Sequence, residues 1–201
     1  SFITVTALTF AAKGVSFFKD AVVAQRFGTG EALDAFMLAF GFVSFVASVL
    51  AGGLPEAFLP LYSELSLRRG LRRSQRLAVQ STLAHAASLL GVGVLIYLFA
   101  PDLVRLTGSG FSPAKRALAA EFMRSLLVFM FCYGMSEQLG TWLRAKKSFA
   151  LPTGAPTLVP VCILVCLLAT GSAPSIHVLM IGTNAGAMVL VLILGMALWR
   201  Q

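Results

Sequence analysis

The sequence has few charged residues, few acids and very little histidine or cysteine. Of its 201 residues, 12% are charged and 58% are apolar, and Asp and Glu number 8 against 16 Lys and Arg. The cysteines Cys132, Cys162 and Cys166 fall in apolar stretches, and His85 and His177 stand alone. Neither set has the spacing of a zinc site or a disulfide framework, so we expect no metal and treat the cysteines as packing residues.

Signatures of catalysis are also missing from the sequence. It shows no Gly-rich phosphate loop, no pair of catalytic carboxylates and no Ser-His-Asp arrangement. We therefore expect neither enzyme activity nor a cofactor.

Long apolar runs separated by short polar stretches give the chain a mean hydropathy of +0.86. This pattern is typical of a polytopic membrane protein. The runs lack the alternation of a barrel strand, and only helices satisfy backbone hydrogen bonds within such runs in lipid. The sequence predicts an all-α membrane protein, a single domain over residues 1–201. Its six transmembrane helices are expected at about 2–27, 32–65, 77–100, 117–143, 151–170 and 176–199.

Two of these helices contain residues that disturb regular helix geometry. The second is too long for one straight span, so Gly52, Gly53 and Pro55 predict a bend or break. Its distal part, 56–65, is expected in or beyond the headgroup layer. The fifth begins with three prolines four residues apart, within 152–160, which predicts kinked or irregular first turns.

Basic residues gather in loops that we expect on one side of the membrane. The loop after the second helix holds Arg68, Arg69, Arg72, Arg73 and Arg76, and the loop after the fourth holds Arg144, Lys146 and Lys147. The opposite side has only Arg26, Arg105, Lys115 and Arg116. The positive-inside rule then places both loops and both termini in the cytoplasm. We expect the arginine loop to contact membrane lipids, or else a partner, and the net charge of +8 does not indicate nucleic acid.

Charged residues inside the first two helices are the main functional clue. An ionised side chain near the bilayer centre costs about 2.5–3.5 kcal/mol, so Lys13, Lys19 and Asp34 are expected to face a hydrated cavity and bind a polar ligand. Lys13, Ser16 and Asp20 share one face of the first helix. Interhelical salt bridges that fix packing are the alternative.

The small and polar residues of the second helix extend this pattern. Gly41, Ser44 and Ser48 follow Asp34 along a narrow seam that leaves room for a cavity. Because cations outnumber anions in the first helix, we expect the cavity to attract an anion such as a phosphate or pyrophosphate headgroup. Lysines, as mobile point charges, suit a ligand that is bound and then released.

A further polar pair lies in the fourth helix. Glu121 and Arg124 have the i,i+3 spacing of an ion pair. It could contribute to the cavity, but we favour a structural role or side chains that reach the membrane surface.

Several motifs resemble those of a known family. They are Lys13 to Asp20, Arg26 to Gly30, Asp34 to Phe36, Glu56 to Pro60, Gly110-Phe111, and Pro152 with Ala155 to Leu158. In this order they resemble the amino-terminal half of the MurJ/MviN family of lipid II flippases, which serve peptidoglycan synthesis. The resemblance covers nearly the whole chain.

The resemblance implies an exporter fold with two lobes of six helices each, of which this chain resembles the first. A second lobe is expected after residue 201, or a second copy of the chain as a homodimer partner. The first segment has no basic leader or uninterrupted apolar core, so it is not expected to be a cleaved signal peptide. Lys13 and Lys19 correspond to basic residues of the family's first helix, and Asp34 to the acid of its second. These positions handle the lipid-linked pyrophosphate in the family.

The sequence also departs from the family pattern in the second helix. A pair of arginines is absent from the equivalent stretch, 45–49, Gly52 stands in place of an acid and Val43 in place of a proline. Lipid II and a lipid-linked intermediate of another exported polysaccharide are therefore both open as substrates.

Three functions fit these observations. The first is a flippase in the bacterial plasma membrane that moves a polyprenyl-pyrophosphate-linked saccharide by alternating access, with Lys13, Lys19, Asp34, Asp20 and Ser16 at its binding site. The second is an ion-coupled multidrug antiporter of the same superfamily, which predicts acids without competing cations. The third is a non-transporting scaffold of polysaccharide synthesis.

Overall fold

The computed structural model describes residues 2–28, 30–171 and 175–200, with the backbone alone described at 2–5, 54–56, 59, 65–69 and 71. These residues form helices and turns, with no strand among them, which confirms the all-α prediction. The elements are α1 (Phe2–Phe27), α2 (Glu31–Arg69), α3 (Leu71–Thr107), α4 (Pro113–Ser125), α5 (Leu127–Ala145), α6 (Ala150–Gly154), the 3-10 turn η1 (Ala155–Thr157), α7 (Leu158–Ala169) and α8 (His177–Trp199).

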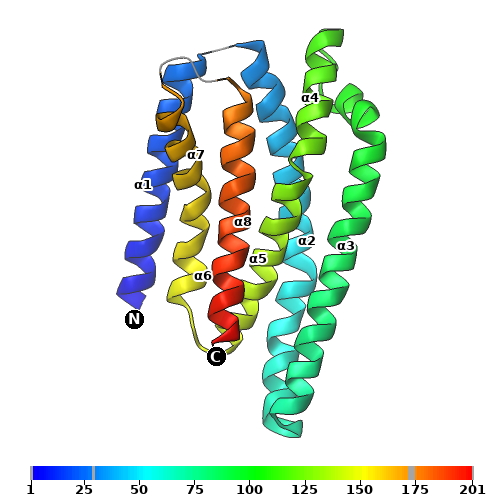
Figure 1. The fold of residues 1–201 in the computed structure, drawn as a ribbon. Coiled ribbons are helices and arrows are strands. Elements are labelled where there is room, and N and C mark those ends of the chain that lie inside the picture. Colours follow the sequence, from blue (N-terminus) through cyan, green and yellow to red (C-terminus); the bar gives the residue numbers. More distant parts are fainter. Residues whose placement is uncertain (1, 29, 172–174, 201) are drawn as a thin grey trace.

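The helices stand side by side and alternate in direction, and the chain ends lie at the same end of the bundle (Figure 1). The pair α4 and α5 forms one rod, and α6, η1 and α7 form another. Apolar side chains of α2, α4, α5 and α8 build the core, among them the fully buried Phe122, Met130 and Leu190.

Five stretches of the described residues are long and apolar enough to cross a membrane. They are Glu31–Gly53, Arg72–Thr107, Pro113–Ala145, Ala150–Ala169 and His177–Trp199. They establish a multi-pass helical protein. α1 lies beside them with 26 residues, and its role as a sixth span stays a prediction.

The hairpin of α2 and α3 differs from the prediction. The α2 helix continues from Glu31 to Arg69 through Gly52 and Gly53, so it does not break there as one form of the prediction has it, and a bend at this point stays a prediction. Only Gly70, at φ 81°, separates it from α3, so most of the expected arginine loop is helical. The side chains of Pro55, Glu56, Arg68 and Arg69 lie outside the described part of the chain.

The predicted fourth helix is interrupted at Leu126, between α4 and α5. Asn184 of α8 binds backbone groups on both sides of this point. Its Oδ1 accepts a hydrogen bond from Phe129 N at 3.0 Å, and its Nδ2 donates to Ser125 O at 3.1 Å. Because unpaired backbone groups are costly in an apolar core, this one side chain stabilises the interruption.

The prolines of the predicted fifth helix have the expected effect. The helical rod changes from α6 to a 3-10 turn over Ala155–Thr157 before α7 begins, which confirms irregular first turns. Beyond that turn, α7 packs closely on α8. A Cβ at Gly186 would lie 2.7 Å from Val159 Cα, and one at Gly182 would lie 2.8 Å from Ile163 Cα.

Candidate functional site

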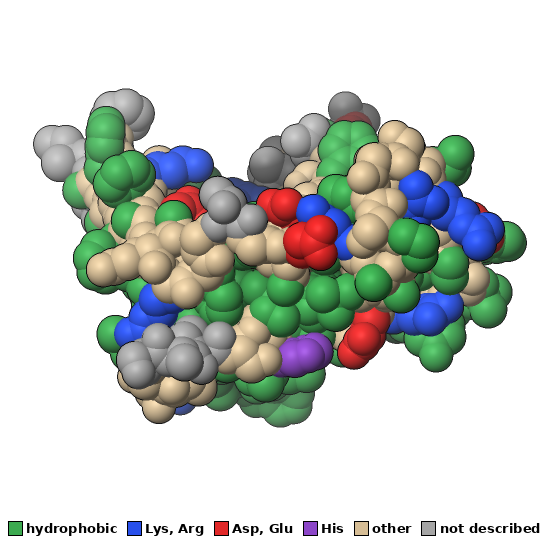
Figure 2. All heavy atoms as spheres, turned by 90° about the horizontal axis from the view of Figure 1, so that it is seen from above, with side chains coloured by type: hydrophobic (Ala, Val, Ile, Leu, Met, Phe, Trp, Pro, Cys, Tyr) green, Lys and Arg blue, Asp and Glu red, His purple; other side chains and the backbone are tan. Residues whose placement is uncertain are grey.

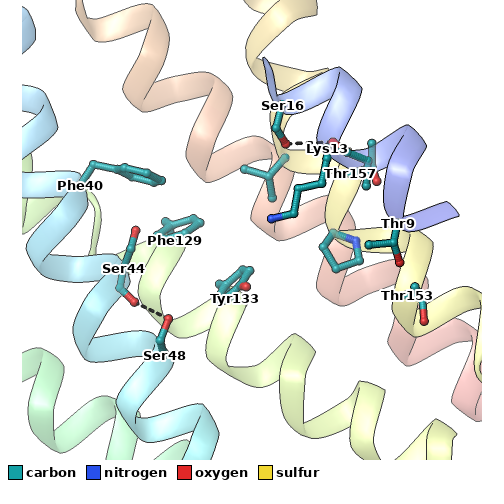
Figure 3. Close-up of a pocket in the computed structure, with 13 residues that line it drawn as sticks. Thr9, Lys13, Ser16, Phe40, Ser44, Ser48, Phe129, Tyr133, Thr153 and Thr157 are labelled. Atoms are coloured by element: carbon teal, nitrogen blue, oxygen red, sulfur yellow. Dashed lines mark hydrogen bonds between the residues drawn. The ribbon is translucent and has the colours of Figure 1, made fainter. Parts of the chain in front are cut away.

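A central cavity of about 550 Å³ opens between α1 and α2. Side chains of α5 and of the α6–η1–α7 rod complete its walls (Figure 3). The lining residues are Thr9, Ala12, Lys13, Ser16, Phe40, Ser44, Ser48, Phe129, Tyr133, Thr153, Pro156, Thr157 and Val159. This cavity brings together two of the predicted site residues, Lys13 and Ser16.

Lys13 extends its amine from α1 into the central cavity (Figure 3). Its side chain forms no hydrogen bond or ion pair with the residues that the structure describes. Ser16 lies one turn further along α1, and its Oγ donates to Ala12 O at 3.0 Å. A cation without a protein partner, in a cavity lined by hydroxyl-bearing and apolar side chains, favours an anionic ligand.

The opposite wall combines hydroxyl groups with aromatic rings. Ser48 Oγ donates to Ser44 O at 2.9 Å, whereas the buried Ser44 Oγ has no partner among the described residues. Phe129 packs against Phe40 and Tyr133, with ring centroids 5.4 and 5.3 Å apart. Such a wall offers hydrogen bonds to a polar headgroup beside an apolar surface for its carrier lipid.

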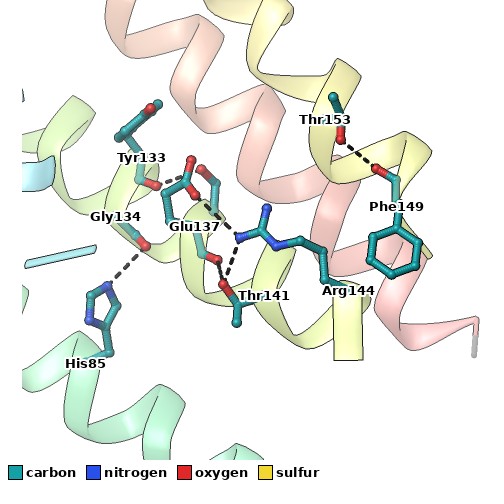
Figure 4. Close-up of polar contacts among 9 residues, drawn as sticks. His85, Tyr133, Gly134, Glu137, Thr141, Arg144, Phe149 and Thr153 are labelled. Carbon is teal, nitrogen blue, oxygen red and sulfur yellow. Dashed lines mark hydrogen bonds and ion pairs between the residues drawn. The ribbon is translucent and has the colours of Figure 1, made fainter. Parts of the chain in front are cut away.

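A lower cavity of about 300 Å³ continues the central one toward the end of the bundle that carries the termini. The two cavities share Ser48 and Tyr133. Glu137, Thr141 and Arg144 of α5 line the lower cavity (Figure 4). Together the two cavities form one polar groove.

An upper cavity of about 240 Å³ contains the other polar residues of α1, Lys19 and Asp20. It shares Phe40 with the central cavity. Lys19 Nζ lies 2.5 Å from Asp20 Oδ1, and the Lys19 side chain is mostly buried. The structure therefore separates Lys19 and Asp20 from Lys13 and Ser16 instead of placing all four in one site.

Asp34 lies outside these three cavities. Its Oδ2 accepts a hydrogen bond from Lys115 Nζ of α4 at 2.7 Å, and Lys115 also lies over the Phe111 ring. For Asp34 the structure shows the alternative, an interhelical salt bridge, and its partner lies on α4 and not on α1. This ion pair belongs to the end of the bundle opposite the termini, where acidic and basic side chains are interspersed among apolar ones (Figure 2).

The ion pair predicted between Glu121 and Arg124 is not formed in the described part of the chain. Arg124 Nε instead donates to Tyr97 O of α3 at 3.1 Å, and the guanidinium lies 5.3 Å from the Tyr97 ring centre. Both charged side chains are exposed and neither lines a cavity. The partner lies on another helix, so i,i+3 spacing could not identify it.

Sequence reasoning did not assign several groove residues to the site. Thr9, Thr153 and Thr157 are ordinary hydroxyls in apolar helices, and no sequence signal marks them. Arg144 was counted only as a basic loop residue, although its position at the end of a helix with Glu137 two turns earlier is visible in the sequence. Among the residues described, no group of three His, Cys, Asp or Glu could hold a metal ion.

Apolar spans around a groove that contains polar side chains define a helical multi-pass membrane protein. Comparison with known families agrees, because the family model described as lipid II flippase MurJ matches residues 23–200. The chain belongs to this family.

Individual relatives show how much of the family protein the chain represents. It is 28% identical over 163 residues to the lipid II flippase MurJ of Thermosipho africanus (strain TCF52B), covering 78% of this chain and 32% of the relative. It is 25% identical to the probable lipid II flippase MurJ of Buchnera aphidicola subsp. Baizongia pistaciae (strain Bp), covering 76% of this chain and 30% of the relative. The chain thus spans about a third of the length of these relatives.

A solved structure also shares the fold. The structure titled lipid II flippase MurJ, inward closed conformation, superimposes with a TM-score of 0.81 at 22% sequence identity. The match covers 96% of this chain and 41% of that one. The fold of this chain therefore matches one part of that longer structure.

Proposed function

We propose that this chain is the amino-terminal lobe of a flippase that moves a polyprenyl-pyrophosphate-linked saccharide across the bacterial plasma membrane. The observation that carries this proposal is the central cavity, into which Lys13 extends an ammonium group without a partner among the described residues. The exposed Ser48 hydroxyl on the opposite wall is a second group that the headgroup can reach. Membership of the flippase family supports the same substrate class.

Alternating access explains how the groove would be used. The groove is open between α1 and α2, so a second lobe, in the same protein or in a second copy, must enclose the headgroup. With the termini in the cytoplasm, the headgroup would pass Lys13 and then Lys19 in the upper cavity, because Phe40 lines both cavities. An inside-negative potential would assist an anion moving outward by about 2.3 kcal/mol per charge per 100 mV.

The saccharide can be that of lipid II or of another polysaccharide precursor, since Lys13 and the aromatic wall would contact the pyrophosphate and its lipid. An antiporter for cationic drugs is not favoured, because the charge that Lys13 places in the central cavity repels such ligands.

Transport by variants of the complete protein tests the proposal. Lys13→Ala and Lys19→Ala should each abolish flipping of the lipid-linked precursor, measured in cells that depend on this protein or in proteoliposomes, while protein levels stay normal. Lys147→Gln, which removes an exposed positive charge outside the groove, should transport normally. Normal transport after removal of both Lys13 and Lys19 would reject the proposal.

A further inference from the structure

Arg144, the penultimate residue of α5, lines the lower cavity. Its guanidinium donates few of the hydrogen bonds that it can form with the described residues. The side chain runs back along its helix, so that Nη2 donates to Thr141 Oγ1 at 2.8 Å (Figure 4). Glu137 Oε2 lies 3.8 Å from the same nitrogen, which is too long for a hydrogen bond. A guanidinium has five N–H donors, and the bond to Thr141 is the only one that this side chain forms within the described residues.

The packing around Arg144 leaves room for the guanidinium in this position. A Cβ at Gly140 would lie 3.8 Å from Arg144 Nη1 and 4.0 Å from Nη2. The same Cβ would lie 3.4 Å from Pro152 Cβ of α6. These are ordinary van der Waals distances, so the guanidinium lies beside Gly140 on the surface of α5, where it lines the lower cavity.

The lower cavity is continuous with the cavity that contains Lys13. Ser48 and Tyr133 line both. Arg144 is about three helical turns beyond Tyr133, and its side chain points back toward that residue. Two cations therefore face one groove at successive depths, Arg144 near the end with the termini and Lys13 further inside.

We propose that Arg144 is a second anion-binding residue, which receives the phosphate groups of a lipid headgroup at the end of the groove before they reach Lys13. Arg binds phosphate through two parallel N–H bonds, which a lysine cannot do. When the groove is empty, the Glu137 carboxylate is the ionic partner of the guanidinium. Since this pair is long and both side chains are about one-third exposed, a phosphate can displace the carboxylate. This inference rests on the proposed function.

Ligand binding to the complete protein in lipid nanodiscs tests the inference. The probes are farnesyl pyrophosphate, as a short lipid pyrophosphate, and inorganic pyrophosphate, and affinity is measured by isothermal titration calorimetry. Arg144→Gln should weaken binding of farnesyl pyrophosphate by about 10- to 100-fold. Glu137→Gln should strengthen it by about 2- to 5-fold, because the competing carboxylate is gone. These opposite effects cannot both arise from misfolding.

Lys147→Gln is the matched control. It removes the same charge from the same chain segment, but Lys147 is exposed and lines none of the three cavities, so binding should change by less than about 2-fold. If Arg144→Gln binds like this control, the role of Arg144 is wrong. If in that case Lys13→Ala still loses binding, the proposed function stands without it.

Three further outcomes decide between the remaining explanations. Weaker binding in Glu137→Gln would contradict the competition between Glu137 and phosphate. Equal affinity for inorganic pyrophosphate and farnesyl pyrophosphate would show that the groove binds a free anion, and it would contradict a lipid headgroup as the ligand. If the wild-type protein binds neither probe, both the proposed function and this inference fail.

Discussion

Lys13 has no acidic partner among the described residues, whereas two other lysines form ion pairs. Lys19 pairs with Asp20, and Lys115 pairs with Asp34. The spacing of Lys13 and Ser16 correctly predicted that they share a helix face. The partner of Asp34 could not be predicted in the same way, because Lys115 is 81 residues away in sequence and meets it only through the packing of α2 on α4.

Loss of the Asn184 side chain should weaken the bundle through hydrogen bonding, because its amide bonds two backbone groups of another rod. Asn184→Ala leaves Phe129 N and Ser125 O without their partner at the interruption between α4 and α5. We expect a loss of about 1–3 kcal/mol in the free energy of unfolding, measured by denaturant titration in detergent.

Ser88→Ala is the control for this prediction. Its hydroxyl bonds only Ala84 O of its own helix, so the substitution should cost less than about 0.5 kcal/mol. Equal stabilities of the two variants would show that Asn184 does not stabilise the interruption.

The element scale shows where sequence patterns suffice and where they fail. Apolar runs predicted helices throughout, and the prolines of 152–160 predicted irregular first turns, which the structure shows as a 3-10 turn. Both α2 and α3 extend beyond their apolar runs. Hydropathy therefore ends the second helix too early, at 65, and makes the third, 77–100, too short at both ends. The interruption at Leu126 has no proline or glycine of its own, because its cause is a side chain of α8.

The contact between α7 and α8 gives a prediction for a pair of helices. Gly186→Ala places a Cβ 2.7 Å from Val159 Cα, and a backbone atom cannot yield as a flexible side chain does. The helices must separate, so we expect a loss of about 1–3 kcal/mol in the free energy of unfolding.

Gly195 offers a matched control on the same helix. A Cβ there meets nothing within 4 Å, so Gly195→Ala should leave stability unchanged or raise it by up to about 1 kcal/mol. Equal tolerance of the two substitutions in a thermal unfolding assay would contradict the close contact between α7 and α8.

At the scale of the whole molecule, the groove arises from how α1 is attached. α1 packs on α6, η1 and α7, and the central cavity separates it from α2. Lys13 thereby faces Ser44 and Tyr133 across a space instead of a packed interface. The sequence predicted a cation of the first helix and the seam of Ser44 and Ser48 at a cavity. It did not predict the walls from α5 and from the α6–η1–α7 rod, because an apolar segment carries no information on its neighbours.

Cysteine labelling at position 48 tests the hydrated, anion-binding groove most directly, because the exposed Ser48 lines both the central and the lower cavity. In a complete protein without other cysteines, Ser48→Cys should react with a membrane-impermeant anionic thiol reagent. Leu98→Cys, on an exposed apolar part of α3, should not react. Farnesyl pyrophosphate should slow labelling of Ser48→Cys several-fold. If Ser48→Cys is as unreactive as Leu98→Cys, or if the pyrophosphate gives no protection, the central cavity does not bind a lipid headgroup.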